Sequence, residues 1–265
     1  MSKIDWNAKT GFFQVNGKAL EFATWGPEPD RAATILLLHE GLGAVGLWRD
    51  FPAALAAQTG LGVLAYSRAG YGRSDPAELP RPVNYMTNEA LDVLPVVLDQ
   101  AGLERAILLG HSDGATIAAI YAGLANDPRL SAAILMAPHF FTEEPGLQAI
   151  SKACTAFETG DLRTKLGKYH ADPDNAFRGW NDAWLNPDFR DWNVESVLDG
   201  VSVPLLAIQG VDDEYGTLAQ MDAISNRLGD AARIVVLKDC GHAPHLEQPA
   251  ATLAATTSFI AGLEH

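Results

Sequence analysis

Cysteine, positive charge and long apolar segments are all scarce in this sequence of 265 residues. Its two cysteines, Cys154 and Cys240, are too few for a disulfide framework, which favours a reducing compartment. Lysine and arginine together number 19 against 33 acidic residues, so the formal charge at pH 7 is −14. Such a chain repels phosphate backbones and anionic lipid surfaces, and we expect neither nucleic acid nor a membrane as a partner.

A targeting or membrane-spanning segment is also missing from the pattern. No apolar run approaches the roughly 20 residues that would span a bilayer. Residues 1–14 show no basic region followed by a long apolar stretch, which is the pattern of a signal peptide. We therefore expect a cytoplasmic protein. The sequence leaves open whether the chain forms a homo-oligomer.

The sequence does contain a series of short apolar runs of strand length. They are rich in isoleucine, leucine and valine and do not alternate with polar residues, which is typical of strands buried on both faces of a parallel sheet. Helical patterning separates most of them, and an early pair of strands turns at Asn16-Gly17. These features predict an α/β fold, a doubly wound and mostly parallel sheet of eight strands. The apolar runs are ATILLL, LGVLAY, RAILLG, SAAILMA, PLLAIQG and ARIVVL.

The alternation of strand and helix breaks off between residues 139 and 202. This stretch has helix-sized pieces separated by proline and glycine, and nine of the 22 aromatic residues fall in it. So many aromatic side chains need an apolar surface to pack against. We therefore predict a helical cap at 139–202, inserted over one end of a core made of residues 1–138 and 203–263.

A candidate nucleophile follows the apolar run that ends at Gly110. Ser112 lies in the sequence Gly-His-Ser-Asp-Gly, between a predicted buried strand and a predicted helix. The G-x-S-x-G pattern places its serine in a strained, tight turn, where larger neighbours would clash with the crossing backbone. The helix that follows presents its N-terminus to any negative charge that develops there.

A serine hydroxyl needs a base, and the base needs a third group that holds it in one tautomer. The sequence offers both after later predicted strands. Residues 211–214 contain two aspartates, Asp212 and Asp213, and the Gly-His step that follows the last strand contains His242. The chain order of serine, acid and histidine is the order expected of α/β-hydrolases.

With these motifs the chain resembles the α/β-hydrolase superfamily over nearly its whole length. HEGLG at 39–43 and GYGRS at 70–74 also match that pattern. The resemblance implies that the acid lies three residues past Gly210, which selects Asp213 and leaves Asp212 as its chief rival. It also implies an oxyanion hole formed by the backbone N–H groups of Gly41 and Asp113.

Two positions depart from that pattern. Relatives commonly carry aspartate where this chain has Ser67, and glycine where it has Glu40. A carboxylate directed into an oxyanion hole would oppose the charge that the hole must stabilise. We expect Glu40 to turn away toward a partner such as Arg49, Arg68 or His39. The alternative is that Glu40 contacts a polar group of the substrate.

The residues of a substrate pocket are sought at the carboxyl edge of the sheet and in the helical insertion. Besides Glu40, we expect the pocket to be lined by His139, Phe140, Trp180 and Trp184, with His170 as a further candidate. The alternative is that the aromatic residues form the core of the insertion. His245 could pair with His242 on a metal ion, but no further ligand accompanies them. We expect no metal and no other cofactor.

These features predict a serine hydrolase that cleaves a carboxylic ester or a lactone of a small molecule through an acyl-enzyme. Hydrolysis of a carbon–carbon bond next to a ketone is the first alternative, because the same triad serves it in related folds. A pocket arginine or a second histidine such as His139 would favour that reaction. The second alternative is a ligand-binding receptor of the same fold with slow turnover.

Overall fold

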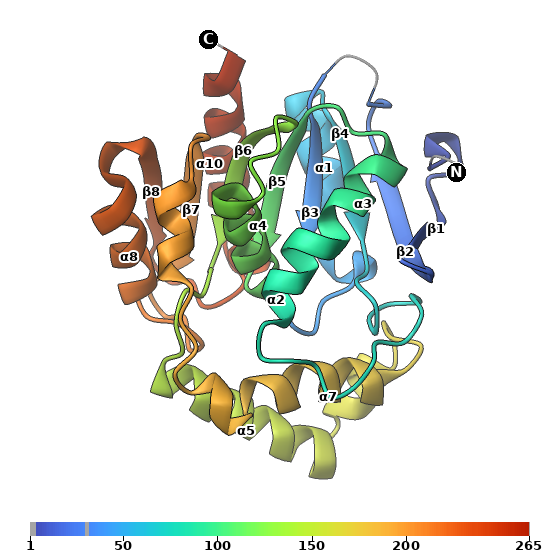
Figure 1. Cartoon of the computed structure of the whole chain (residues 1–265), viewed down its shortest axis with the longest axis vertical. Coiled ribbons are helices and arrows are strands. Elements are labelled where there is room, and N and C mark those ends of the chain that lie inside the picture. The colour runs from blue at the N-terminus through green and yellow to red at the C-terminus, as the bar shows by residue number, and fades with distance from the viewer. Residues whose placement is uncertain (1–3, 30–31, 265) are drawn as a thin grey trace.

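The computed structural model describes residues 4–29 and 32–264 and contains one eight-stranded sheet (Figure 1). The strand order is β1-β2-β4-β3-β5-β6-β7-β8. The first two strands run antiparallel to their neighbours and the other six are parallel, which confirms the predicted sheet. The strands are β1 Thr10–Val15, β2 Lys18–Trp25, β3 Thr34–Leu38, β4 Gly62–Tyr66, β5 Ala106–His111, β6 Leu130–Met136, β7 Leu205–Gly210 and β8 Ala232–Leu237.

The β1–β2 hairpin turns where the sequence predicts it. Asn16 and Gly17 both have positive φ angles, of 49° and 80°, as a two-residue turn of type I′ requires. Val15 pairs with Lys18 directly across this turn. The hairpin forms one edge of the sheet, and β8 forms the other.

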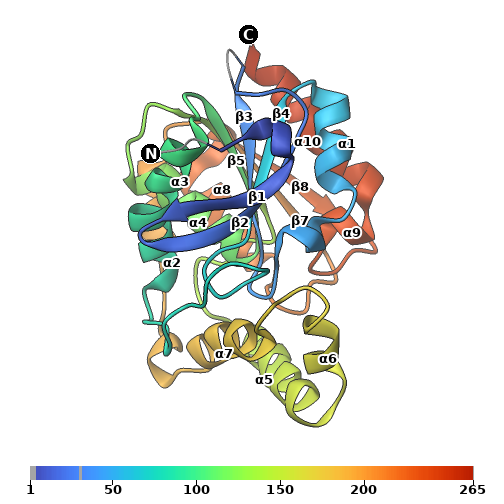
Figure 2. The ribbon, with the colours of Figure 1, turned by 90° about the vertical axis from the view of Figure 1, so that its right-hand side faces the viewer.

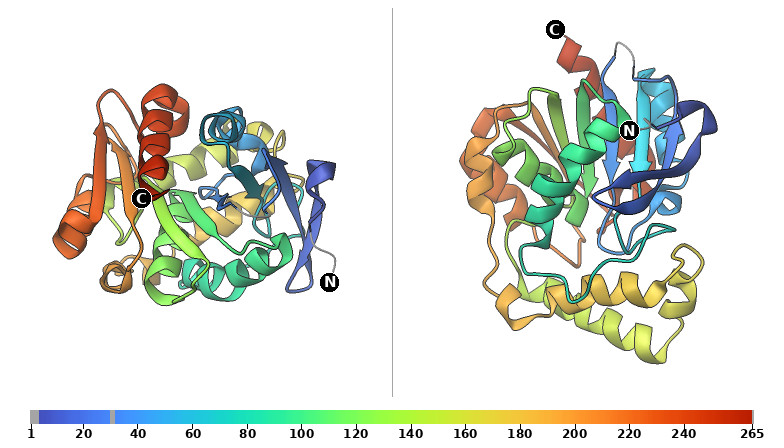
Figure 3. Two further views of the ribbon diagram at one scale, coloured as in Figure 1. Left: turned by 90° about the horizontal axis from the view of Figure 1, so that it is seen from above. Right: turned by 45° about the vertical axis from the view of Figure 1, so that its right-hand side comes forward.

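Helices cover both faces of the sheet (Figure 3). Helices α1 and α10 contact each other on one face, and α4 packs on β5 and β6 on the opposite face. None of the helices in the described part of the chain is long and apolar enough to cross a membrane. The helices are α1 Phe51–Thr59, α2 Tyr85–Asn88, α3 Leu94–Ala101, α4 Asp113–Leu124, α5 Glu144–Thr159, α6 Leu162–Leu166, α7 Pro173–Trp184, α8 Ala219–Leu228, α9 Pro244–Glu247 and α10 Pro249–Ala261.

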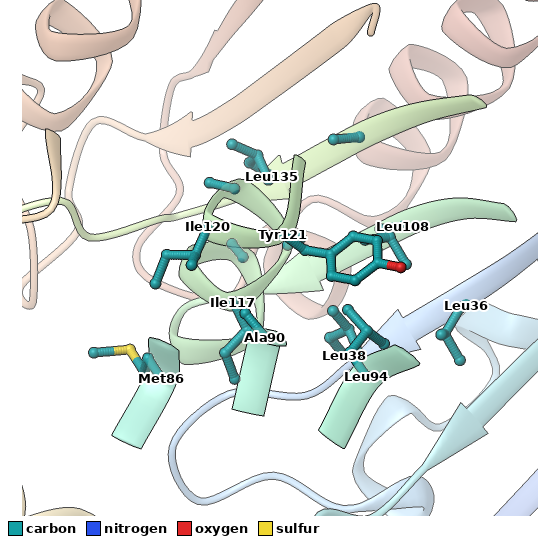
Figure 4. Close-up of a cluster of buried hydrophobic side chains, with 14 of the residues drawn as sticks. Leu36, Leu38, Met86, Ala90, Leu94, Leu108, Ile117, Ile120, Tyr121 and Leu135 are labelled. Atoms are coloured by element: carbon teal, nitrogen blue, oxygen red, sulfur yellow. The ribbon is translucent and has the colours of Figure 1, made fainter. Parts of the chain in front are cut away.

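The central strands bury both of their faces, and successive side chains enter two separate cores. Along β3, Leu36 and Leu38 join the core under α2, α3 and α4, which Figure 4 shows. Ile35 and Leu37 join the other core with α1 and α10. A strand with apolar neighbours on both faces needs apolar residues at every position, which explains why its sequence does not alternate.

Residues 139–202 contain the three helices α5, α6 and α7, which lie together beyond the carboxyl ends of the parallel strands (Figures 1 and 2). Part of their aromatic content packs within the segment. The rings of Phe157 and Phe177 stack with centroids 3.9 Å apart, and Phe189 packs on Trp192 at 4.9 Å. The division of the chain into a hydrolase core and a cap stays a prediction.

Candidate active site

The backbone at Ser112 is strained, as the glycine pattern predicts. This residue joins β5 to α4 with φ 52° and ψ −119°, a conformation rare for a residue with a side chain. A Cβ atom on Gly110 would lie 2.2 Å from the carbonyl oxygen of Gly114, and one on Gly114 would lie 2.0 Å from that of Leu38. Only glycine fits where the turn crosses the backbone so closely.

The close approach at Gly114 gives a testable consequence for stability. The methyl group of Gly114→Ala would collide with backbone atoms of β3, which cannot rotate away. We expect the free energy of unfolding to fall by about 3 kcal/mol or more, measured by urea unfolding. Gly262→Ala is the matched control, because a Cβ atom there has open space around it. Equal stability of the two variants would contradict this reading of the turn.

His242 and Asp213 form a direct pair. The Nδ1 atom of His242 lies 2.9 Å from both carboxylate oxygens of Asp213. The same carboxylate accepts hydrogen bonds from the backbone N–H of Tyr215 at 2.9 Å and from the side chain of Gln209 at 3.1 Å. Burial alone would raise the pKa of Asp213, but the hydrogen bond and charge of His242 hold that pKa below its usual value.

The geometry distinguishes Asp213 from Asp212, the other candidate for the acid. The Asp213 side chain is 1% exposed and contacts the imidazole, whereas Asp212 is exposed. The backbone N–H of Asp212 donates to the carbonyl oxygen of Cys240 at 2.9 Å, which anchors the loop after β7 to the loop after β8. The arrangement therefore favours Asp213 as the residue that would orient His242.

Ser112 and His242 line the same small cavity, together with Gly41. The cavity has a volume of about 110 Å³ and a mostly apolar wall. Three of its residues, Leu42, Ile150 and Tyr215, were not among the predicted pocket residues. Tyr215 lies only two positions after Asp213, so its closeness to the predicted acid could have indicated a place in the pocket. The full lining is Glu40, Gly41, Leu42, Ser112, His139, Ile150, Trp180, Trp184, Tyr215 and His242.

The structure places the predicted pocket residue Phe140 elsewhere, so this prediction is wrong. Phe140 is fully buried in the larger core and does not line the cavity. Its backbone N–H donates to the side chain of Gln220 at 2.7 Å, and the N–H of Val194 donates to its carbonyl oxygen at 2.6 Å.

His170 does not line the cavity either. Its ring joins two loops, accepting from the N–H of Gly72 and donating to the carbonyl oxygen of Leu42, both at 3.0 Å.

His139 lies beside the candidate base. Its ring centroid is 5.6 Å from that of His242 and 5.2 Å from that of Trp184. Burial, aided by the charge of His242, lowers the pKa of His139 to about 3. The ring is therefore neutral near pH 7 and can exchange hydrogen bonds with a ligand without supplying a positive charge.

The loop that carries Gly41 is held from behind by the buried side chain of Arg68. The guanidinium group donates to the carbonyl oxygens of His39 and Glu40, the second at 3.1 Å, and His39 Nδ1 donates to the same Glu40 oxygen at 2.7 Å. A trans peptide directs its carbonyl and its N–H in opposite directions. The N–H of Gly41 therefore points away from Arg68 and His39.

The carboxylate of Asp113 is buried beneath the helical segment. It accepts from the hydroxyl of Tyr85 at 2.5 Å and from the indole N–H of Trp184 at 3.2 Å, and Arg68 Nη2 lies 3.8 Å away. These partners fix the first residue of α4, so the Asp113 side chain has a structural task. Its backbone N–H is one of the four at a helix start that have no partner within the helix.

Glu40 has a partner that differs from those we expected. Its carboxylate lies 3.4 Å from Nδ1 of His111, whose other ring nitrogen lies 2.7 Å from the carbonyl oxygen of His242. Arg68 and His39 bind the backbone oxygen of Glu40 instead of its side chain. The Glu40 side chain is 27% exposed and forms part of the cavity wall. The residue therefore meets a histidine on one side and the cavity on the other.

Ser67, where the family resemblance leads us to expect aspartate, binds a carboxylate from another strand. The Ser67 hydroxyl donates to Glu21 on β2 at 2.9 Å. Glu21 also accepts from the backbone N–H and the Nε of Arg73, at 3.0 and 2.7 Å. A carboxylate from β2 thus reaches the 67–74 loop.

His245 lies in α9, where it is 4% exposed and its ring faces those of Trp48, Phe51 and His111. We find no group of three or more histidine, cysteine, aspartate or glutamate side chains fit to hold a metal among the described residues. The burial of His245, with a smaller contribution from the charge of His111, lowers its pKa to about 3 from an ordinary 6.5.

This shift predicts a pH dependence of stability. Below pH 6.5 the unfolded chain takes up a proton at this histidine, while the folded chain does so only near pH 3. The free energy of unfolding therefore falls as the pH falls through this window, by up to about 1.4 kcal/mol per pH unit. We expect His245→Gln to remove that part of the slope between pH 6 and pH 4, measured by urea unfolding. An unchanged slope would contradict a neutral, buried His245.

A known protein family matches most of the chain. The model described as the alpha/beta hydrolase family matches residues 35–256, and the chain belongs to this family. A 2-hydroxy-6-oxononadienedioate/2-hydroxy-6-oxononatrienedioate hydrolase of Cupriavidus pinatubonensis is 28% identical over 245 residues, which cover 80% of this chain and 81% of that protein. The family and such relatives support a hydrolase.

Other similarities are more local or more distant. The 1-acylglycerol-3-phosphate O-acyltransferase ABHD5 of Sus scrofa is 33% identical over 113 residues, so the match covers 43% of this chain and only about a third (32%) of that protein. The structure of an enol-lactonase from Burkholderia xenovorans superposes with a TM-score of 0.74 at 20% identity, covering 95% of this chain and 100% of that one. A membrane phospholipase A superposes with a TM-score of 0.78 at 19% identity, covering 97% of this chain and 86% of the other. At these identities the two structures show the shared fold alone.

Proposed function

We propose that the protein is a serine hydrolase that cleaves a carboxylic ester or a lactone of a small molecule. The observation that carries the proposal is one cavity lined by Ser112 in its strained turn, by His242 held on Asp213, and by Gly41. A nucleophile, a base and an oxyanion donor are what acyl transfer needs within reach of one carbonyl group.

In the proposed reaction His242 removes the hydroxyl proton of Ser112 as the serine oxygen attacks the carbonyl carbon. The N–H groups of Gly41 and Asp113 stabilise the resulting oxyanion, each contributing roughly 10²–10³ in rate. The intermediate collapses, and the alcohol leaves with the proton from His242. Water, activated by the same histidine, then hydrolyses the acyl-enzyme and releases the acid.

We further propose that residues 139–202 act as a cap on a core of residues 1–138 and 203–263. Trp180 and Trp184 from α7 and Ile150 from α5 line the cavity, so this segment would close the substrate in from above. A Cβ atom on Gly41 would lie 2.1 Å from the Trp180 ring, which places α7 directly against the oxyanion loop. Closure of this kind excludes water from the reacting carbonyl.

Carbon–carbon bond hydrolysis is the second candidate, because a relative named for such a substrate matches most of the chain and His139 lies beside His242. The residues of the cavity wall disfavour this reaction. None of the ten lining residues is lysine or arginine, and His139 is neutral near pH 7. The dioate in that relative's name carries two carboxylates, for which this wall offers no cation.

A substrate panel tests the proposal directly. Purified protein is offered small esters, lactones and diketones, and product per site is counted beside thermal shifts with the same compounds. We expect many turnovers per site with an ester or a lactone. Turnover of the diketones alone would favour the second candidate. Ligand-dependent thermal shifts without turnover would instead indicate a receptor.

A further inference from the structure

The wall of the cavity carries one carboxylate and, apart from the candidate base, no basic side chain except His139, which is neutral near pH 7. The carboxylate belongs to Glu40, which stands next to Gly41 in the oxyanion loop. The other residues of the wall with polar side-chain atoms are Ser112, His139, Tyr215 and Trp180, whereas the indole N–H of Trp184 is engaged by Tyr85 and Asp113. The apolar surface comes from Leu42, Ile150, Trp180 and Trp184.

Glu40 is held in its ionised form. Burial would raise the pKa of its carboxyl group, but the interaction with the His111 ring, 3.4 Å away, outweighs burial and holds that pKa well below its usual range. His111 is 2% exposed in its side chain and lies behind the wall, whereas the Glu40 side chain is 27% exposed. Of this pair, Glu40 is therefore the exposed member and the one that belongs to the cavity wall.

Two further features of the site favour positive over negative ligands. Trp180 and Trp184 offer aromatic rings, whose faces attract cations and repel anions. A carboxylate that entered the cavity would lose its hydration and find no lysine or arginine among the lining residues to replace it.

We infer that Glu40 makes this site selective for uncharged and cationic esters and against esters that carry a carboxylate. The inference rests on the proposed ester hydrolysis and names its substrate class. In an apolar cavity a charge a few ångströms from a like charge costs far more than in water. We expect a cationic ester to exceed its carboxylate counterpart by about 100-fold in kcat/KM.

The test uses esters of similar length, with the charge placed once in the alcohol and once in the acyl group. The first series is the acetate esters of choline, 3,3-dimethylbutanol and 3-hydroxypropanoate. The second series is the phenyl esters of 4-(aminomethyl)benzoic acid, 4-ethylbenzoic acid and terephthalic acid. Within each series the readout is the ratio of kcat/KM for the cationic ester to that for the anionic ester.

The variant Glu40→Gln tests whether the selectivity comes from the charge of Glu40 or from the overall charge of −14. We expect the ratio to fall about tenfold or more in the variant. The exposed acid substitution Asp212→Asn changes the net charge equally and should leave the ratio unchanged. If Glu40 only supported the fold, all three esters of a series would slow by the same factor and the ratio would stay constant.

The outcomes distinguish the inference from the function on which it rests. A wild-type ratio near one, or a preference for the carboxylate esters, overturns the inference while ester hydrolysis stands. This comparison uses the wild-type protein alone, so it does not depend on whether a variant folds. A ratio that stays high in Glu40→Gln overturns the role of Glu40. Absence of turnover with every ester of both series, and with every ester and lactone of the substrate panel, overturns the proposed function and the inference together.

Discussion

Replacing Ser112 with alanine is expected to reduce kcat for ester hydrolysis by 10⁴-fold or more without unfolding the protein. The alanine removes the oxygen that would attack the carbonyl carbon, and the remaining groups can only assist the attack of water. Ser112 makes no side-chain hydrogen bond to cap α4, so its hydroxyl can be lost at little cost to that helix. The measurement is kcat on an ester that the wild-type protein turns over.

Its matched control is Ser258→Ala, an exposed serine on α10, away from the cavity. This variant should keep its activity within a factor of two. Activity of Ser112→Ala within tenfold of the wild type, with an unchanged melting temperature, would show that another group is the nucleophile.

The second large effect is expected at Asp213. Asparagine in its place would still reach Nδ1 of His242 but could present an N–H to it, which favours the tautomer that cannot accept a proton from Ser112. It would also remove the negative charge that stabilises the cationic imidazole. We expect kcat to fall by about 10⁴-fold in Asp213→Asn.

Asp212→Asn is the natural comparison, because the two residues are adjacent and only Asp213 contacts the histidine. The Asp212 variant should retain activity within a few-fold. If Asp212→Asn lost activity and Asp213→Asn kept it, the acid would be the rival residue, contrary to the observed pairing.

The sheet was predictable because its strands have a simple physical signature. A strand buried on both faces needs apolar residues at each position, and β3 with its successive side chains in two cores has that pattern. The hairpin was predictable from Asn16-Gly17, because asparagine and glycine tolerate the positive φ angles that the turn requires at both positions. The Ser112 turn was predictable for a related reason, because its glycines are required by backbone contacts that no other residue allows.

The wall of the cavity was less predictable, because it depends on which way each side chain turns after the strands end. Phe140 follows His139 directly, yet one enters the core and the other the cavity. The pairing of Glu40 with His111 joins two loops that are far apart in the sequence. Such contacts are decided by how the loops pack on each other, which local spacing does not encode.

The most direct test of the account is to label the protein with a fluorophosphonate and locate the adduct by mass spectrometry. The reagent modifies serine hydroxyls that a neighbouring base activates. We expect one adduct, on Ser112, and its loss in His242→Ala. An adduct on a different residue, or an unlabelled Ser112 in folded protein that hydrolyses esters, would contradict it.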